Sequence, residues 1–438
     1  MKKGGNRVKK VFILLLSLLA AAGLPACGGA ENQGTPPPEE KEPVEITLWC
    51  YPVGDWGTPT AMSKLVTGFR REFPDILLSV EYPDYDTGDA KVNEAIEAGN
   101  APDLVFESPE RLVAGWGDRG LMADLSDLWA EDHSEGIYDA IRSACRHNNG
   151  EYYVYPLCSS AHCMAVNYDL FQAAGALQYL DAENHTWTTE GFISAVNALR
   201  AYGQERVGAV YCGGQGGDQG TRALVNNLYG GVFTDSEHTR YMADSPENAQ
   251  ALQLLRDLDG IAFDPELAGK GEIEQFCRGE LAMAFCWNCT LEVMHTVKNP
   301  DLDFRVLPMA FPTSSGEPRL QGGIYGLGVF DNGDEERVAA AKAFIRYIAG
   351  SEEAYTRAVQ MSNNWPVKDG ENIYANDALM TEYSLFVPYV GDYYQVTPNW
   401  PAARTAWWTM LQKVGRGEDI AQALRDFDAE ANGPLGAA

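Results

Sequence analysis

The sequence has little positive charge for its length. Its 438 residues include 33 lysines and arginines against 62 aspartates and glutamates, a formal net charge of −29. Nucleic acids and anionic bilayers are bound mainly through clustered lysines and arginines, so this deficit argues against both as binding surfaces. The acidic residues are spread along the chain rather than gathered in blocks, which predicts a solvated acidic surface.

The sequence also lacks an apolar run of the length that spans a membrane. The apolar stretch at 11–22 is too short, and it follows five basic residues and precedes the sequence LPAC at 24–27. This pattern is typical of a lipoprotein export signal, so we expect residues 1–26 to be a signal peptide and Cys27 to be the lipid acceptor. An ordinary signal with a chance cysteine is the alternative. The resulting prediction is a protein anchored by lipid at the outer face of the cytoplasmic membrane, at the cell surface or on the periplasmic side, with residues 27–43 as a flexible tether rich in Gly, Pro and Glu.

Nucleotide and metal motifs are missing. The glycine-rich stretch at 213–220 has no Gly-Lys-Ser/Thr ending, which favours a flexible loop over a phosphate cradle. Besides Cys27 there are eight cysteines, and only Cys286 and Cys289 form a tight pair. Zinc would need two more ligands, and His295 is the only histidine close by in sequence. We therefore expect buried thiols or one or two disulfides, no metal and no cofactor.

The hydrophobic pattern after residue 43 predicts an α/β fold. Residues 44–51 alternate between apolar and polar, and strand, helix, strand, helix, strand follow one another up to residue 106. A second such alternation begins near Trp187, with no internal repeat and no second linker. About 390 residues can form two lobes with real cores. In open parallel sheets, ligands bind beyond the carboxyl ends of the strands, here residues 52–57 and 107–111.

Short motifs occur in order along nearly the whole chain after residue 43. They are ITLW at 46–49, APDLVF at 101–106, YPL at 155–157, NYDLF at 167–171, GELAM at 279–283, LP at 307–308, GG at 322–323, AFI at 343–345 and PNWP at 398–401. In this order they resemble the extracellular solute-binding proteins of sugar-importing ABC transporters, the group that includes maltose- and maltodextrin-binding proteins.

The resemblance implies a two-lobed fold of the periplasmic-binding-protein type II, with two α/β domains joined by hinge strands and the ligand between them. We expect one lobe to comprise 44–157 and 304–350, and the other 158–303 and 351–434. It also implies a monomer without enzymatic activity that captures a sugar or oligosaccharide by lobe closure and delivers it to the permease subunits of an ABC transporter.

Sugar binding needs aromatic faces for C–H surfaces and planar polar side chains for hydroxyls. The chain has 10 tryptophans and 21 tyrosines, each of which is also an ordinary core residue, so position must decide. Trp56 lies in the loop after the first strand, Trp287 follows a buried strand and Trp365 precedes a late helix. Of the adjacent Trp407 and Trp408, one is expected in the core, and we prefer Trp407 for the ligand.

The resemblance adds polar candidates. Asp55 matches a loop that supplies a polar contact in maltodextrin-type proteins, and Glu110 and Arg111 match an acid and an arginine that bind sugar hydroxyls there. Glu107 stands where those proteins have a tryptophan, and Ser160 stands where they have an acid, which leaves the length and orientation of the sugar open. The predicted ligand site comprises Tyr51, Asp55, Trp56, Glu107, Glu110, Arg111, Ser160, Trp287, Asn288, Gly323, Trp365 and Trp407.

Two alternative functions remain open. The acids Asp55, Glu107 and Glu110 would suit a cationic solute such as a polyamine or an amino-sugar compound, or a metal chelate. A lipid-anchored glycoside hydrolase would need two carboxylates at a fixed separation, and among 62 acids suggestive pairs are easy to find.

Overall fold

The structure is a computed structural model that describes residues 42–85, 87–214, 218–368, 373–391 and 393–433. The predicted signal peptide, Cys27 and nearly all of the predicted tether lie outside these residues, as does part of the glycine-rich loop. None of the helices in the described ranges has the length and apolar character needed to cross a membrane.

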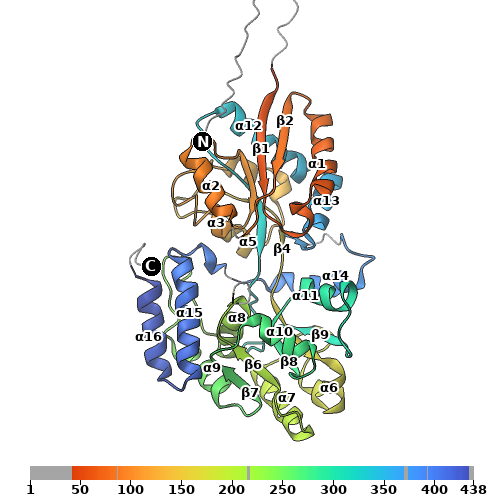
Figure 1. Cartoon of the computed structure of the whole chain (residues 1–438), viewed down its shortest axis with the longest axis vertical. Helices are drawn as coiled ribbons and strands as arrows, with labels where there is room; N and C mark the ends of the chain where they lie inside the picture. The colour runs from red at the N-terminus through yellow and green to blue at the C-terminus, as the bar shows by residue number, and fades with distance from the viewer. Residues whose placement is uncertain (1–41, 86, 215–217, 369–372, 392, 434–438) are drawn as a thin grey trace, which may run out of the picture. The chain divides into compact units, whose positions relative to one another are not determined.

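The first lobe is built on a six-stranded sheet in the order β11-β4-β10-β3-β1-β2. Strand β1 lies parallel to β2 and β3, as the sequence predicts, whereas β10 is antiparallel to both β3 and β4, so the complete sheet is mixed. Figure 1 shows β1 and β2 with α1 and α2 to either side. The strands are β1 (Val44–Cys50), β2 (Ile76–Glu81), β3 (Leu104–Glu107), β4 (Tyr155–Ser159), β10 (Ile324–Val329) and β11 (Trp365–Pro366).

One hydrophobic core, the first core, holds this lobe together. Ile46, Leu48 and Cys50 of β1 are at most 1% exposed, and they meet the apolar faces of the surrounding helices. Their alternation with more exposed neighbours is the period-two pattern of a strand covered on one face. The helices are η1 (Gly54–Gly57), α1 (Pro59–Glu72), α2 (Gly88–Glu97), α3 (Pro109–Leu112), α4 (Ser126–Trp129), η2 (Asp132–Ser134), α5 (Asp139–Ala144), α12 (Glu335–Gly350) and α13 (Glu352–Ser362).

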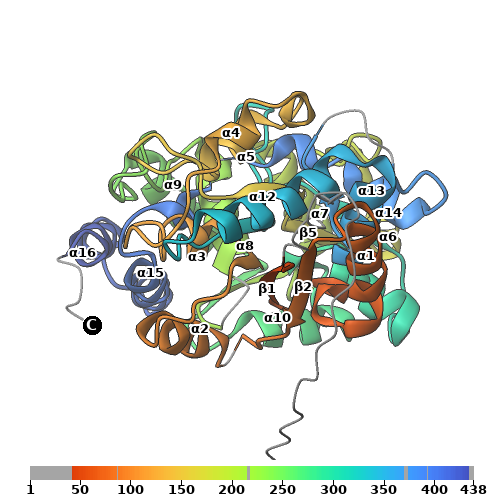
Figure 2. The ribbon, with the colours of Figure 1, turned by 90° about the horizontal axis from the view of Figure 1, so that it is seen from above.

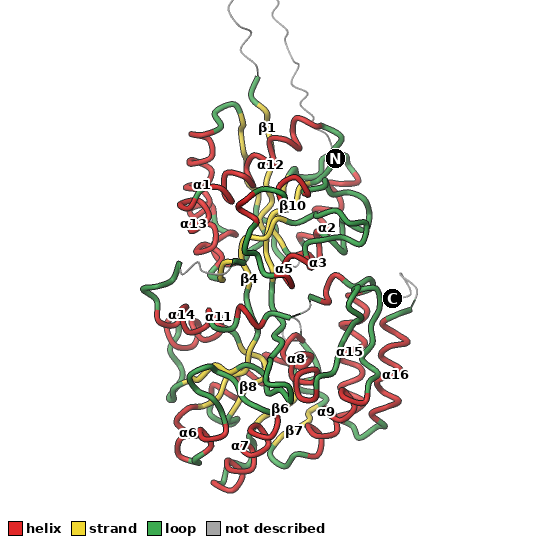
Figure 3. The backbone as a smooth tube through the Cα atoms, turned by 180° about the vertical axis from the view of Figure 1, so that it is seen from behind, coloured by secondary structure: helices red, strands yellow, loops and turns green. Residues whose placement is uncertain are grey.

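The second lobe has two small sheets, β8-β5-β9 and β6-β7, around a separate second core. Figure 3 shows its strands apart from those of the first lobe. The strands are β5 (Cys163–Asn167), β6 (Gly208–Tyr211), β7 (Ile261–Asp264), β8 (Met283–Trp287) and β9 (Val306–Met309). The helices are α6 (Tyr168–Ala173), η3 (Ala176–Tyr179), α7 (Thr189–Tyr202), α8 (Asp218–Tyr229), α9 (Pro246–Asp257), α10 (Gly269–Cys277), α11 (Cys289–Val293), η4 (Met294–Lys298), α14 (Ala378–Ser384), η5 (Val387–Tyr389), η6 (Tyr394–Val396), α15 (Trp400–Gly415) and α16 (Ile420–Ala431).

Two extended segments run side by side between the lobes, one joining β4 to β5 and the other joining β9 to β10. The Ser160 N–H donates to the Gly323 carbonyl at 2.8 Å, and the His162 N–H donates to the Gln321 carbonyl at 2.7 Å. Gly322 is required here, because a Cβ at this position would lie 1.6 Å from the Ser160 carbonyl oxygen. A third crossing follows α13, where Trp365 packs in the second core and Val367 in the first.

The expected lobe boundaries differ from the packing at two places. Residues 304–309 were assigned to the first lobe, but β9 pairs antiparallel with β5 and its side chains enter the second core. Helix α13 was assigned to the second lobe, but its apolar face packs into the first core. Both errors arise because a linear pattern shows that a segment is apolar without showing which core it enters.

Helix caps follow the sequence signals. Ser245, Ser351 and Asp419 each accept a backbone N–H bond from the third residue after them, at the starts of α9, α13 and α16. At α16 the Gln422 side-chain oxygen accepts from Arg425 at 2.9 Å, and its amide N–H donates to Asp426 at 2.7 Å, so Gln422 does not complete a capping box with the Asp419 N–H.

Two buried carboxyl groups in the second core make stability depend on pH. Burial raises the pKa of Glu292 to about 7, although hydrogen bonds from Tyr383 and Trp287 oppose this shift. Burial likewise raises the pKa of Glu272 to about 8, although hydrogen bonds from the Phe285 and Cys286 N–H groups oppose it. Because these folded-state values lie above the unfolded value of about 4.5, the folded protein binds more protons between about pH 4.5 and 8. The stability that comes from these bound protons is fully present below about pH 4.5 and is lost as the pH rises toward about 8.

We therefore expect the free energy of unfolding to fall as the pH rises from about 4.5, up to about pH 7 for Glu292 and about pH 8 for Glu272, by at most about 1.4 kcal/mol per pH unit for each group. Urea unfolding at several pH values measures this slope. Glu292→Gln keeps an acceptor for Tyr383 and should flatten the slope. An equal slope in wild type and variant would contradict the assignment.

Candidate functional site

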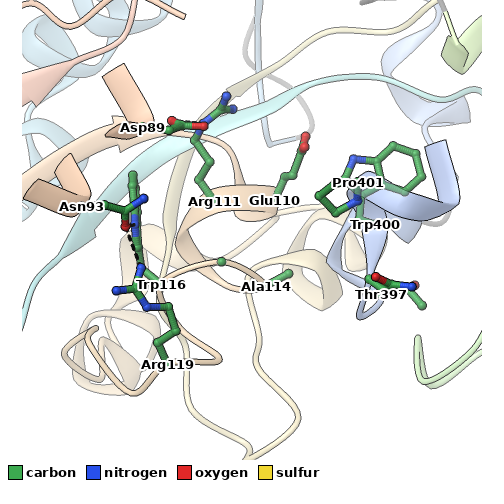
Figure 4. Close-up of a pocket in the computed structure, with 12 residues that line it drawn as sticks. Asp89, Asn93, Glu110, Arg111, Ala114, Trp116, Arg119, Thr397, Trp400 and Pro401 are labelled. Atoms are coloured by element: carbon green, nitrogen blue, oxygen red, sulfur yellow. Dashed lines mark hydrogen bonds and ion pairs between the residues drawn. The ribbon is translucent and has the colours of Figure 1, made fainter. Parts of the chain in front are cut away.

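A cavity of about 280 Å³ lies between α2 and α3 of the first lobe and the start of α15. Figure 4 shows Asn93 and Trp116 on one side, Trp400 and Pro401 on the other, and Glu110 between them. Its lining combines two indole rings, four ionisable side chains and several polar groups. The lining residues are Asp89, Asn93, Glu110, Arg111, Ala114, Gly115, Trp116, Arg119, Thr397, Asn399, Trp400 and Pro401.

The strand-to-helix connection after β3 positions the first-lobe part of the cavity. Pro109 occupies the first turn of α3 and starts the helix directly beyond the carboxyl end of β3, so Glu110 and Arg111 emerge at the sheet edge where the sequence predicts a ligand. Asp89 and Asn93 are four residues apart on α2 and therefore share one helix face.

The opposite wall begins at a backbone turn. Asn399 precedes α15 with φ of 66°, a left-handed conformation that asparagine tolerates better than most residues, and Pro401 lies in the first helical turn. The Trp400 ring is packed by two guanidinium groups, Arg222 at 4.6 Å and Arg404 at 5.3 Å from its centroid. Figure 2, seen from above, shows α15 beside α2 and α3.

Arg111 is the centre of a charged network behind the cavity. Its Nε donates to Asp89 at 2.8 Å and its Nη1 to the buried Glu107 at 3.3 Å. Burial lowers the pKa of Arg111, but Glu107 and Asp89 outweigh burial and hold the pKa above its usual range. The Tyr51 hydroxyl donates to the same Asp89 oxygen at 2.6 Å. The guanidinium is thereby fixed in one orientation.

Tyrosine hydroxyls surround the acids of this network. Burial, reinforced by the negative charges of Glu107 and Glu110, raises the pKa values of Tyr325 and Tyr393 above the usual range. These phenols stay neutral at physiological pH and keep their O–H groups as donors. Tyr85 is 46% exposed, so its ring is open to solvent beside Arg111.

The structure brings four of the predicted site residues together. Glu110 and Arg111 line the cavity, while Tyr51 and Glu107 bond to the network directly behind it. Tyr51 is fully buried and faces the Arg111 guanidinium at 5.2 Å.

The four predicted tryptophans lie in the cores, which corrects the expectation that they form aromatic walls. Trp56 stacks on Phe106 in the first core with a centroid distance of 3.7 Å. The other three belong to the second core, and all four are at most 3% exposed. Each indole N–H has an internal acceptor, which explains how the polar end of the ring can be buried. The four bonds run from Trp56 to the Ala358 carbonyl, from Trp287 to the Tyr383 hydroxyl, from Trp365 to the Met380 carbonyl and from Trp407 to the Thr221 hydroxyl.

The remaining candidates have other structural roles. Asn288 caps α11 by accepting the Leu291 N–H at 2.9 Å. Ser160 and Gly323 bond to each other in the segments between the lobes, where the Ser160 hydroxyl accepts the Gly323 N–H at 3.1 Å. Asp55 is exposed in η1 and does not line the cavity described above. The eight cysteines after Cys27 are thiols; seven are buried and Cys277 is half-buried.

The sequence does not single out most residues of the cavity lining. The PNWP motif at 398–401 indicates the family but not the site, yet Asn399, Trp400 and Pro401 form one wall of the cavity. Asp89 and Asn93 stand four residues apart and so share one helix face, but their local sequence does not show that this face lines a cavity. Trp116 and Arg119 follow α3 in an irregular stretch and carry no local signal either.

The comparisons with known proteins agree on family and fold. The family model for bacterial extracellular solute-binding proteins matches residues 64–382. The cyclic α-maltosyl-1,6-maltose binding protein from Arthrobacter globiformis is 22% identical, with a TM-score of 0.71 over 89% of this chain and 98% of that one. The sugar-binding protein MalE from Xanthomonas citri is 14% identical, with a TM-score of 0.72 over 88% and 95%.

A third similar structure is the ABC substrate-binding protein Lmo0181 from Listeria monocytogenes in complex with cycloalternan, at 18% identity and a TM-score of 0.62 over 89% of this chain and 98% of that one. These likenesses show the two-lobed α/β fold. No curated protein sequence matches the chain. The family match covers well over half of the chain, which therefore belongs to the bacterial extracellular solute-binding proteins.

Proposed function

We propose that this protein captures a neutral sugar or oligosaccharide in the cavity between α2, α3 and α15 and delivers it to the permease of an ABC transporter. The observation that carries the proposal is the lining of that cavity, where polar and charged side chains offer hydrogen-bonding groups beside Trp116 and Trp400, which are themselves only 4% and 2% exposed. Several proteins of the same fold bind carbohydrates, including cycloalternan and maltotriose.

The charges of the cavity favour a neutral ligand. Its lining holds two carboxylates, Asp89 and Glu110, and two guanidiniums, Arg111 and Arg119, so the formal charges cancel. Each is also held by a neighbour: Arg119 donates to Asn93 at 2.6 Å, and Glu110 lies 4.0 Å from Arg404. A sugar hydroxyl both donates and accepts, and this mixture of fixed donors and acceptors suits it. A polyamine would be better served by an excess of acids.

Both lobes contribute to the cavity, which is what capture by closure requires. Asp89 and Arg111 belong to the first lobe, while Trp400 packs in the second core. A ligand shifts the balance between open and closed forms only if it binds the closed form better, and contacts from both lobes provide that difference. In this proposal the protein acts as a monomer, and the lipid on Cys27 keeps it beside the permease.

We propose no catalytic step. One carboxylate oxygen of Asp89 already accepts hydrogen bonds from Arg111 and Tyr51. Chromatography of oligosaccharides after incubation separates the two functions: unchanged sugar supports capture, and hydrolysis products would support a glycosidase.

A thermal-shift panel tests the ligand class. Maltose, maltotriose and cyclic maltosyl-maltose represent neutral sugars, and spermidine and glucosamine represent cations. A ligand at about 100 times its Kd stabilises the folded state by about 2.7 kcal/mol, so we expect a clear rise in Tm with at least one neutral sugar. A rise with spermidine alone would contradict the proposal.

A further inference from the structure

Three metal-ligating side chains meet on the surface of the second lobe, away from the cavity. The thiol of Cys277, the imidazole of His295 and the carboxylate of Asp301 each offer a ligand atom, and these atoms lie within 4.8 Å of one another. The residues come from the last turn of α10, from η4 and from the segment after η4. The chain thus brings together residues that are 18 and 6 positions apart in the sequence.

The neighbouring structure orients these groups. Residues Met294–Lys298 form a π-helical turn, a geometry that often marks functional sites. The Asp301 N–H donates to the His295 carbonyl at 3.1 Å, and an Asp301 carboxylate oxygen lies 2.9 Å from His295 Nδ1. The fully buried Trp287 stacks on the imidazole with 6.0 Å between centroids and 24° between the ring planes.

The site is reachable and its charge fits a divalent cation. The Asp301 side chain is 53% exposed and that of His295 is 20% exposed, while Cys277 is half-buried. A thiolate and a carboxylate together neutralise a 2+ ion. The nearest arginine in sequence, Arg278, forms an ion pair with Glu280 at 2.7 Å.

We propose that Cys277, His295 and Asp301 bind a zinc ion, with water as the fourth ligand. Sulfur, imidazole nitrogen and carboxylate oxygen together are a zinc ligand set, whereas calcium and magnesium prefer oxygen alone. In a tetrahedral zinc site the ligand atoms are about 3.5 Å apart, so small side-chain rotations close the present separations. The ion replaces the hydrogen bond between His295 and Asp301 and ties α10 to η4.

Cobalt(II) substitution tests the ligand set directly. Wild-type protein titrated with Co²⁺ should develop a thiolate-to-cobalt charge-transfer band in the near ultraviolet, which zinc then displaces. Cys277→Ser should remove the band, and His295→Gln and Asp301→Asn should weaken binding about tenfold or more. His147→Gln is the matched control, because His147 also pairs with an aspartate, Asp118, at 2.8 Å but has no role in the proposed site; it should leave the titration unchanged.

A second measurement needs no variant. Among the cysteines of the described ranges Cys277 alone is half-buried and the others are at most 5% exposed, so alkylation of the native protein should label Cys277 before those others. Zinc should slow that labelling, as followed by mass spectrometry. Absence of a charge-transfer band in wild type, its persistence in Cys277→Ser, or equal labelling with and without zinc would overturn the proposal.

Discussion

Replacing Trp407 by alanine is expected to lower the free energy of unfolding by about 3–5 kcal/mol, because a fully buried indole is removed from the second core. Its ring packs edge-on against Phe233 at 5.3 Å and Phe427 at 5.7 Å, and its N–H donates to the Thr221 hydroxyl at 3.0 Å. Denaturant unfolding measures the change through a lower midpoint at unchanged slope.

The adjacent Trp408 is the matched control. It lies on the same helix, is half-buried and packs against Tyr211 with 6.0 Å between the ring centroids. Trp408→Ala should therefore lower the free energy of unfolding clearly less than Trp407→Ala does. Trp407→Ala should leave the sugar affinity of the folded fraction near that of wild type, since the indole is enclosed in the core. A variant that folds normally but no longer binds sugar would show instead that Trp407 reaches the ligand.

Replacing Arg111 by alanine is expected to weaken sugar binding by about 1.5–3 kcal/mol, roughly 10- to 150-fold, as is usual when a hydrogen bond from a charged group is lost. Arg111 lines the cavity, and Glu107 and Asp89 hold it in place. The variant should also be less stable, because the carboxylate of Glu107 is 1% exposed and loses its countercharge. Calorimetric titration with the best sugar from the thermal-shift panel gives the affinity.

Arg142→Ala controls for the loss of an arginine elsewhere in the first lobe. Arg142 lies over the Trp129 ring at 4.9 Å and donates to the Ser134 carbonyl, and it does not line the cavity. The sugar affinity of the Arg142→Ala variant should equal that of the wild-type protein. Equal affinities of Arg111→Ala and wild type would place the ligand elsewhere.

The strands, helices and caps of the chain were predictable wherever local physics decides them. Residues 44–50 alternate because one face of β1 is covered, and Ser245, Ser351 and Asp419 start helices because their side chains satisfy free backbone N–H groups. The prediction that the carboxyl end of β3 faces the ligand stays a prediction, with Glu110 and Arg111 of that segment lining the cavity.

The role of each aromatic residue was not predictable in the same way. A tryptophan offers the same ring to a core or to a sugar, and its local sequence does not reveal whether its N–H finds an internal acceptor. Trp56 and Trp407 find such acceptors in Ala358 and Thr221, which are 302 and 186 residues away. Trp400 lines the cavity although it too is only 2% exposed, and its local sequence carries no stronger signal than theirs.

The sequence by itself determined the α/β class, the family and the starts of several helices, because hydrophobic period, capping chemistry and motif order are properties of neighbouring residues. Only the tertiary structure decided which tryptophans are buried, which core β9 and α13 join, and that Asp89, Arg111 and Trp400 share one cavity. The physical reason is that burial and charge pairing depend on contacts between segments hundreds of residues apart, and the chain must cross between the lobes several times to make them.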